Sequence, residues 1–250
     1  MVRLFEDTYI KAIADAIRAK NGKSDTYKVS EMAGAISAIS AGGGDIDALI
    51  NRSITEISSN VALVGEDAFK NCESLVTADL PLATKISHNA FVECISLESI
   101  NIPLVTNVGQ QTFSSCKKLK KVNIPCVTFI NSNAFYKCEM LETVDIGSET
   151  YVSGYSFANC YSLKAVIMRS TSKNNLVATS AFNGCCHILG TTNATYNPDA
   201  LKDGYFYVPR STIDSYTSSS DWGTWATQFR ALEDYTVDGT ITGELDESKI

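Results

Sequence analysis

Cysteine and histidine are the side chains in this sequence that could ligate a metal ion or form a nucleophile with its base. The chain holds eight cysteines but only two histidines, His88 and His187. His187 directly follows Cys185 and Cys186, and these three residues form the one ligand-like group in the sequence. Three consecutive side chains cannot all converge on one tetrahedral ion. We therefore expect no metal site and no cofactor.

Catalysis by a serine nucleophile or by paired carboxylates would need a recognisable setting, which we do not find. No Gly-x-Ser-x-Gly motif surrounds any serine. Carboxylates are plentiful, but no pair outside the repeat described below can be assigned as the acid and base of a glycosidase. We therefore assign no catalytic residue and expect a non-enzymatic protein. An enzyme hidden in the C-terminal region would lack any supporting group of residues.

Most of the cysteines belong to a repeat that decides the fold. Phenylalanines follow one another at intervals of 22 residues, with a last interval of 25: Phe69, Phe91, Phe113, Phe135, Phe157 and Phe182. A cysteine stands three residues after each of them, a Leu or Ile six after, and a Val or Ile five before. Self-similarity at such a fixed period is typical of a solenoid.

The cysteines of this column are expected to be reduced and buried. They are Cys72, Cys94, Cys116, Cys138, Cys160 and Cys185. Stacked neighbours would hold their Cβ atoms about 4.8 Å apart, whereas a disulfide needs about 3.8 Å. A free cysteine in such a position behaves as a small apolar side chain.

Each repeat also contains a short segment in which apolar and polar residues alternate, which predicts one strand per unit. The inward pairs are Ala78/Leu80, Ile100/Ile102, Val122/Ile124, Val144/Ile146 and Val166/Met168. A unit of about 22 residues cannot bury this edge alone, so neighbouring units must stack. We predict a repeat solenoid, mainly β with short helical or irregular turns, a small N-terminal helical segment and a C-terminal α/β cap.

The same alternation defines the side chains that point away from the core. In the first four units they are polar: Thr77, Asp79, Ser99, Asn101, Lys121, Asn123, Thr143 and Asp145. Ala165 and Ile167 occupy these positions in the fifth unit. A ladder of short polar groups suits an extended ligand such as a glycan, so these eight residues are the candidate ligand-binding site. The alternative is a solvated sheet surface without a ligand.

The repeat resembles a known family. Ala68 to Pro81 and Ala90 to Pro103 follow the pattern Ala-Phe-x-x-Cys-x-x-Leu-x-x-(Val/Ile)-x-(Leu/Ile)-Pro. This pattern is similar to the BspA-type leucine-rich repeats of bacterial surface and phage proteins. The resemblance covers about residues 53 to 190. The sixth unit is expected to be irregular, because Lys173 to Asn175 are inserted and Thr191 stands where a strand valine is expected.

Changes of pattern divide the chain into four parts. Residues 1–44 are predicted to be a helical attachment segment that ends in a Gly-rich linker, and residues 45–190 are the solenoid. Residues 191–233 are expected to form a cap, in which Tyr205 to Val208 are a strand and the apolar residues at helical spacing cover the open end of the core: Ile213, Tyr216, Trp222, Trp225, Phe229 and Leu232. The alternative is a platform of tryptophans on which a sugar stacks. Residues 234–250 are an acidic tail to which we assign no function.

The two ends resemble segments of phage and prophage tail-associated proteins, on the residues Asp7 to Lys20, Tyr27 to Ala33 and the acidic tail. That resemblance implies a virion-associated protein, in which residues 1–40 bind a phage structural protein and the solenoid contacts a bacterial surface glycan or protein. The alternative is a bacterial cell-surface adhesin of the BspA-like repeat family. Such an adhesin would normally carry a signal peptide and an anchor.

Charge and hydropathy narrow the partners further. A net charge of -7 and a pI near 4.9 argue against nucleic acid, whose binding depends on clustered Lys and Arg. Lys117, Lys118, Lys120 and Lys121 form a local basic group, which is either a solvated turn or a contact for an anionic polymer. No stretch reaches the about 20 apolar residues of a membrane span, and the first residues do not match a signal peptide. We expect cytoplasmic synthesis.

Overall fold

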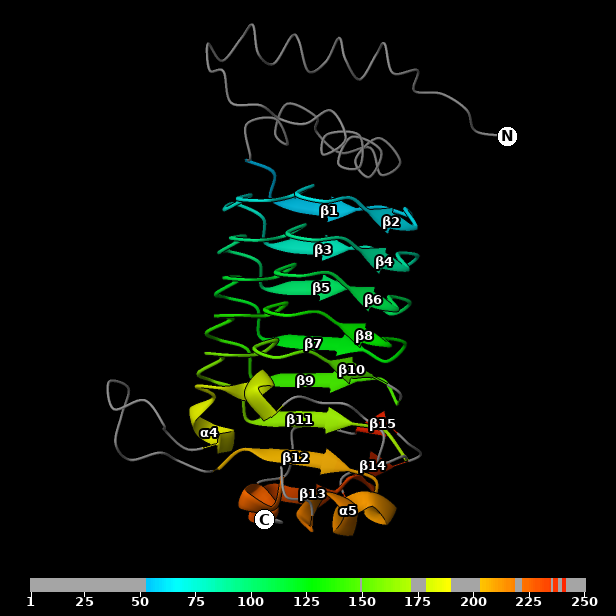
Figure 1. Cartoon of the computed structure of the whole chain (residues 1–250). Helices are drawn as coiled ribbons and strands as arrows, with labels where there is room; N and C mark the ends of the chain where they lie inside the picture. Colours follow the sequence, from blue (N-terminus) through cyan, green and yellow to red (C-terminus); the bar gives the residue numbers. More distant parts are fainter. Residues whose placement is uncertain are drawn as a thin grey trace, which may run out of the picture.

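The computed structural model describes residues 53–148, 150–171, 179–189, 203–218, 222–234, 236–237 and 240–241. In these ranges the chain winds into a solenoid of stacked coils (Figure 1). The predicted solenoid is therefore confirmed. The helices predicted within residues 1–44, the insertion at 173–175 and Thr191 lie outside the described residues.

Each regular coil contributes two parallel strands. The longer strands stack in one column, which we call the main sheet: β1 (Glu56–Ser58), β3 (Thr77–Asp79), β5 (Ser99–Asn101), β7 (Lys121–Ile124), β9 (Thr143–Ile146), β11 (Ala165–Met168), β12 (Tyr205–Val208) and β13 (Phe229–Ala231). Strand pairing divides this column into two parts, β1–β3–β5 and β7–β9–β11–β12–β13. The shorter strands form a second column beside it: β2 (Leu63–Val64), β4 (Lys85–Ile86), β6 (Asn107–Val108), β8 (Phe129–Ile130) and β10 (Tyr151–Val152). The predicted inward pairs of the main sheet are buried, apart from the partly buried Ile100, which still packs against the core.

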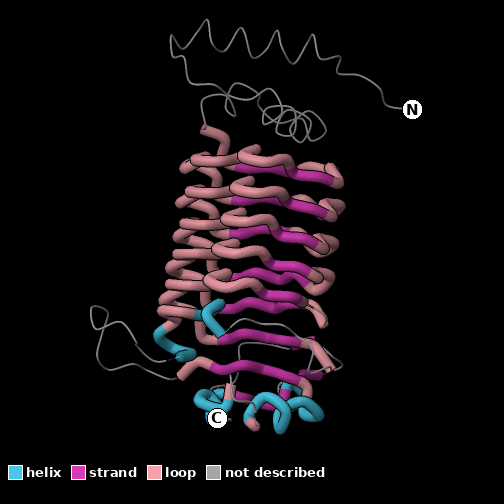
Figure 2. Tube along the Cα trace, viewed as in Figure 1, coloured by secondary structure: helices cyan, strands magenta, loops and turns pink. Residues whose placement is uncertain are grey.

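Turns close the remaining side of each coil, as the loops in Figure 2 show. In the first turn, the N–H groups of Asp67, Phe69 and Asn71 donate to carbonyl oxygens of the next coil at 3.1, 2.7 and 2.8 Å. Left-handed residues flank the phenylalanine on both sides in five turns: Asp67/Asn71, Asn89/Glu93, Gln111/Ser115, Asn133/Lys137 and Tyr155/Asn159. Their φ angles lie between 54° and 63°. The turns thus add a third backbone ladder to the two sheets.

The phenylalanine column forms a continuous stack of rings through the core. Neighbouring centroids from Phe69 to Phe182 lie 5.1 to 5.5 Å apart, and every ring is fully buried. The column cysteines are buried beside it, as the repeat predicts. From Cys94 onward, each column thiol donates to a phenylalanine carbonyl of the preceding coil, for example Cys94 Sγ to Phe69 O at 3.0 Å. Burial raises the pKa well above its ordinary value at Cys116, Cys160 and Cys185, which keeps these thiols protonated.

The sixth coil takes its main strand from β12. Phe206 of β12 lies in register with Val166 of β11, so it fills the strand position for which Thr191 offered no apolar side chain. The strand of this coil therefore comes later in the chain than the repeat predicts, because Phe206 stands 24 residues after Phe182 whereas Val166 stands nine after Phe157. Two short helical elements precede β12: η1 (Thr179–Phe182) and α4 (Cys186–Leu189).

An aromatic cap covers the C-terminal end of the stack. Trp222 meets Phe182 and Phe206 edge to face, with centroids 6.4 and 5.2 Å apart. The helical spacing predicted correctly that Ile213 and Tyr216 lie on a helix, α5 (Ile213–Thr217). It was wrong for Phe229, which is in β13, because its ring stacks on Phe206 at 5.2 Å and thereby continues the sheet.

Several shorter elements complete the C-terminal region. They are η2 (Arg210–Thr212), η3 (Gly223–Gln228), η4 (Leu232–Asp234) and the antiparallel pair β14 (Thr236–Val237) and β15 (Thr240–Ile241). In the main and second sheets every pairing is parallel. The antiparallel pair therefore stands apart from the repeat.

Thiol labelling tests the cysteine column. We expect Cys126, which is exposed, to react rapidly with a thiol reagent, and the half-buried Cys186 to react slowly. The six column cysteines should react only after unfolding, because all of them are buried. Replacing Cys126 with Ser should abolish the rapid phase. Rapid labelling of most thiols without denaturant, or disulfides found by mass spectrometry, would contradict the register.

Truncation of one ring tests the phenylalanine stack. Phe113→Ala removes a fully buried ring that has a stacked neighbour on each side. The free energy of unfolding should fall by about 3–5 kcal/mol in denaturant titrations. Leu82→Ala is the control, because Leu82 is 50% exposed, and it should change stability by less than about 0.5 kcal/mol. Equal effects of the two substitutions would show that the rings do not form the core.

Candidate functional site

The candidate ligand-binding residues lie on the outer side of the main sheet, in two columns that cross the strands. One column is Glu56, Thr77, Ser99, Lys121 and Thr143, and the other is Ser58, Asp79, Asn101, Asn123 and Asp145. We call these ten residues the strand face. All eight residues named from the sequence are in it. Parallel pairing in register aligns those on β1, β3 and β5 and, separately, those on β7 and β9, while β5 and β7 are in contact without pairing. Their role in binding a ligand stays a prediction.

Most of the strand face is open to solvent. Seven of its ten side chains are exposed, Thr77 and Thr143 are half-buried, and Asp145 is buried. Asn101 donates from Nδ2 to Asp79 Oδ1 at 2.7 Å, which links two neighbouring coils. Lys121 and Asn123 stand exposed on the next strand. The face therefore offers hydroxyl, carboxamide, carboxylate and ammonium groups at the regular spacing of the ladder.

Asp145 differs from the other members because it is 8% exposed. Arg169 holds it with two hydrogen bonds, Nε to Oδ1 at 2.9 Å and a terminal nitrogen to Oδ2 at 2.7 Å. The hydrogen bond to this carboxylate raises the pKa of Arg169. Both carboxylate oxygens of Asp145 are thus bound to Arg169, which leaves them little capacity to bind a ligand. The part of the strand face that is available to a ligand therefore ends before Asp145.

Beyond Asp145 the outer side of the sheet becomes a second, small core. Ala165, Ile167 and Tyr207 are at most 2% exposed and pack in one cluster with Leu232. The expectation that Ala165 and Ile167 are free of any role in a core was therefore wrong. They do point outward, but residues of the C-terminal region contact them. The strand face is thus limited to β1, β3, β5, β7 and β9.

The sequence analysis missed two members of the strand face, Glu56 and Ser58. They lie on β1, whose coil has neither the phenylalanine nor the proline of the repeat. Ile57 pairs with Ala78 across 21 residues, so β1 also departs from the 22-residue interval. The alternation around Ile57, with exposed neighbours on both sides, is the signal that could have identified this strand.

The other chemically active side chains have local partners. His88 Nδ1 accepts a hydrogen bond from the Gln110 N–H at 2.8 Å, and His187 Nδ1 lies 2.5 Å from Asp203 Oδ1. Within the described ranges, no three His, Cys, Asp or Glu side chains gather where they could hold a metal ion. In the basic group, Lys117 pairs with Glu139 at 3.4 Å. No helix in the described part of the chain is long and apolar enough to cross a membrane.

One protein family matches the sequence of the repeat region. The model of the BspA type leucine rich repeat region matches residues 49–164 and 84–208, with six copies of the repeat. These ranges together cover more than half of the chain. A search of curated proteins found no match.

Solved structures of leucine-rich repeat proteins are also similar. The pneumococcal vaccine antigen PcpA is 16% identical over 71% of this chain, with a TM-score of 0.49. The T. pallidum leucine rich repeat protein is 22% identical over 53% of this chain (TM-score 0.42), and one from Bacteroides ovatus is 22% identical over 66% (TM-score 0.38). The matched parts span 39%, 59% and 48% of these proteins, respectively.

A double-mutant cycle tests the pair that closes the strand face. Asp145→Ala and Arg169→Ala should each lower the free energy of unfolding by about 1–3 kcal/mol, because each leaves the other group without its charged partner. The double variant should lose less than the sum of the two. Asp79→Ala, on the exposed part of the face, should cost less than about 0.5 kcal/mol. Additive effects of the first two substitutions would exclude the coupling.

Proposed function

Because the chain belongs to the family of BspA-type leucine-rich repeat proteins, we propose that it is a non-catalytic recognition protein whose strand face binds a bacterial surface glycan. The observation that carries this proposal is the exposed polar ladder on five adjacent strands, which ends where Asp145 pairs with Arg169. An apolar interface with a protein would need large exposed hydrophobic side chains, and the ten residues of the strand face include none.

The chemistry of the strand face fits an extended chain of sugars. Hydroxyl and carboxamide groups both donate and accept hydrogen bonds, as sugar hydroxyls do. The strands repeat these groups at about 4.8 Å, so a glycan lying across the strands meets similar partners on each coil. Exposed charges of both signs, on Glu56, Asp79 and Lys121, favour no strongly charged polymer.

The biological setting proposed for this recognition is a phage or prophage tail. In this proposal residues 1–40 attach to a phage structural protein, and the solenoid reaches the bacterial surface. The proposal is supported by the resemblance of residues 7–20 and 27–33, which lie outside the described residues. A bacterial cell-surface adhesin is the second candidate, and membership of the BspA-type family supports it. Immunogold labelling of virions and of intact cells would separate the two.

Adhesion of the purified chain to a panel of bacteria tests the strand face. After an adherent strain has been found, Asn101→Ala/Asn123→Ala should weaken binding about tenfold or more, because two hydrogen-bonding groups are removed from adjacent strands. Flow cytometry of fluorescently labelled protein measures the loss. Protease treatment of the cells should leave binding intact if the ligand is a glycan.

The control places the same kind of change on the neighbouring sheet. Lys85→Ala/Asn107→Ala alters outward side chains of β4 and β6, which pair in the same parallel register. This variant should bind like the parent chain, and circular dichroism should show both variants folded. Unchanged adhesion of the strand-face variant would refute the proposed surface. Loss of adhesion after protease treatment would replace the glycan with a protein receptor.

A further inference from the structure

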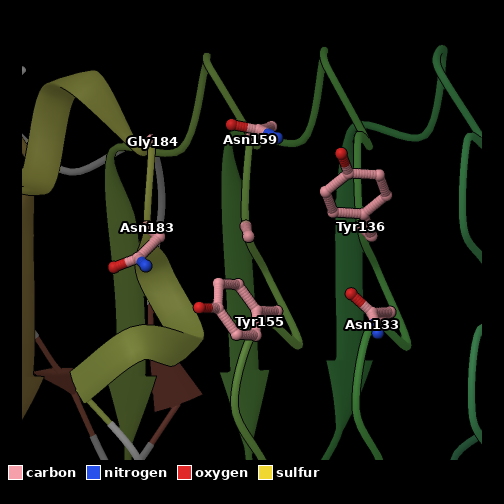
Figure 3. A pocket seen from close by; sticks show the side chains of 7 residues that line it. Asn133, Tyr136, Tyr155, Asn159, Asn183 and Gly184 are labelled. Atoms are coloured by element: carbon pink, nitrogen blue, oxygen red, sulfur yellow. The ribbon is translucent and has the colours of Figure 1, made fainter. Parts of the chain in front are cut away.

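A hollow of about 530 Å³ opens on the turn side of the solenoid, away from the strand face. Three consecutive coils line it with two tyrosines, Tyr136 and Tyr155, and three asparagines, Asn133, Asn159 and Asn183. Figure 3 shows these side chains in two rows in front of the strands, with both tyrosine rings seen from their faces. We call this group the tyrosine–asparagine hollow.

The hollow arises because one position of the repeat changes size from coil to coil. The residue after the phenylalanine is Tyr136 in one coil, Ala158 in the next and Asn183 in the third. Ala158 is 2% exposed and forms the floor between its two larger neighbours. Volumes of this size are ordinary for sites that bind small molecules. The hollow therefore depends on particular side chains, and the regular repeat alone does not create it.

Tyr155 has a backbone conformation that is unfavourable for its size. Its φ is 61°, in the left-handed region, where bulky residues are rare. The corresponding residues of the four preceding turns are Asp67, Asn89, Gln111 and Asn133. Asparagine and aspartate tolerate this conformation, whereas tyrosine is strained. The ring is nevertheless 51% exposed, so it does not compensate for the strain by filling the core.

Asn159 lies on the middle one of the three coils that line the hollow. Gly184, with φ 78°, lies so close that a Cβ atom there would come within 2.3 Å of Asn159 Oδ1. Glycine at this position leaves the room that the carboxamide occupies. No other described side chain or backbone group hydrogen-bonds to the carboxamides of Asn133, Asn159 and Asn183. Three uncommitted carboxamides thus surround the exposed ring of Tyr155 and the half-buried ring of Tyr136.

We propose that the tyrosine–asparagine hollow binds a neutral saccharide. The apolar C–H face of a sugar ring packs on a tyrosine face, and its hydroxyls exchange hydrogen bonds with the carboxamides, which both donate and accept. No carboxylate lines the hollow, and the one ammonium group that contacts a lining residue is that of Lys137, whose Nζ lies 5.3 Å from the centroid of the Tyr136 ring. With tyrosines on adjacent coils, the site suits an oligosaccharide of more than one sugar unit. This site is separate from the strand face.

Binding of neutral trisaccharides tests the proposal. Maltotriose, cellotriose, mannotriose and the N-acetylglucosamine trimer are titrated into the purified chain by calorimetry, and we expect at least one to bind. Tyr155→Asn restores the residue type of Asn133 one coil earlier, and should weaken that binding about tenfold. The same substitution should raise the melting temperature, because it removes the backbone strain. Tyr136→Ser, which copies Ser114, should also weaken binding.

The matched control is Tyr151→Asn, which copies Asn107 at the same position two repeats earlier and does not line the hollow. Tyr151 is 39% exposed on β10, so the control removes an exposed ring while the hollow stays intact, and binding should be unchanged. The strand-face variant Asn101→Ala/Asn123→Ala should also bind the trisaccharide normally, which separates this site from the proposed function. The proposal is overturned if none of the four sugars binds, or if Tyr155→Asn binds as tightly as the parent.

Discussion

Every coil of this protein must meet its neighbours at the spacing of a hydrogen-bonded ladder, and the phenylalanine stack is the side-chain arrangement that fits this spacing. Ring centroids 5.1 to 5.5 Å apart match the separation of paired strands closely. Cysteine suits the adjoining column because it is small and its thiol can donate to a phenylalanine carbonyl of the preceding coil. One residue type thus fills space and satisfies a buried acceptor.

Periodicity was sufficient to predict the solenoid, the buried columns and the outward residues of the strands, because all three follow from a fixed interval between equivalent residues. It could not predict features that depend on how different coils fit together. The pair of Asp145 and Arg169 joins residues 24 positions apart, and Arg169 lies just beyond a strand. Phe229 lies in a strand, where its ring stacks on Phe206, although its spacing from the neighbouring aromatic residues is that of a helix. The turn residues with a left-handed backbone conformation differ in type from coil to coil, so no residue type identified these positions in the sequence.

The two candidate sites arise in different ways from this regular frame. On the strand face, pairing in register sets the positions, and small polar residues make successive coils alike. In the tyrosine–asparagine hollow, a large, a small and an intermediate side chain follow one another at the same repeat position. The columns of the core tolerate little variation, because neighbouring side chains there are in contact. Positions outside those columns can change singly, so one scaffold can carry both a repetitive and a local recognition surface.

The edge-to-face closure by Trp222 also bears on self-assembly. A solenoid with two open ends could add further chains head to tail, as a heterologous contact that never closes, and would grow into filaments. Each joint of such a filament needs one end of one molecule and the opposite end of the next. In the described part of the chain, Phe182 meets Phe206 and Trp222 at interplanar angles of 73° and 64°, so the column of parallel phenylalanine rings ends at Phe182. A second chain cannot add its own ring to Phe182 without displacing these residues, which disfavours head-to-tail polymerisation through this end.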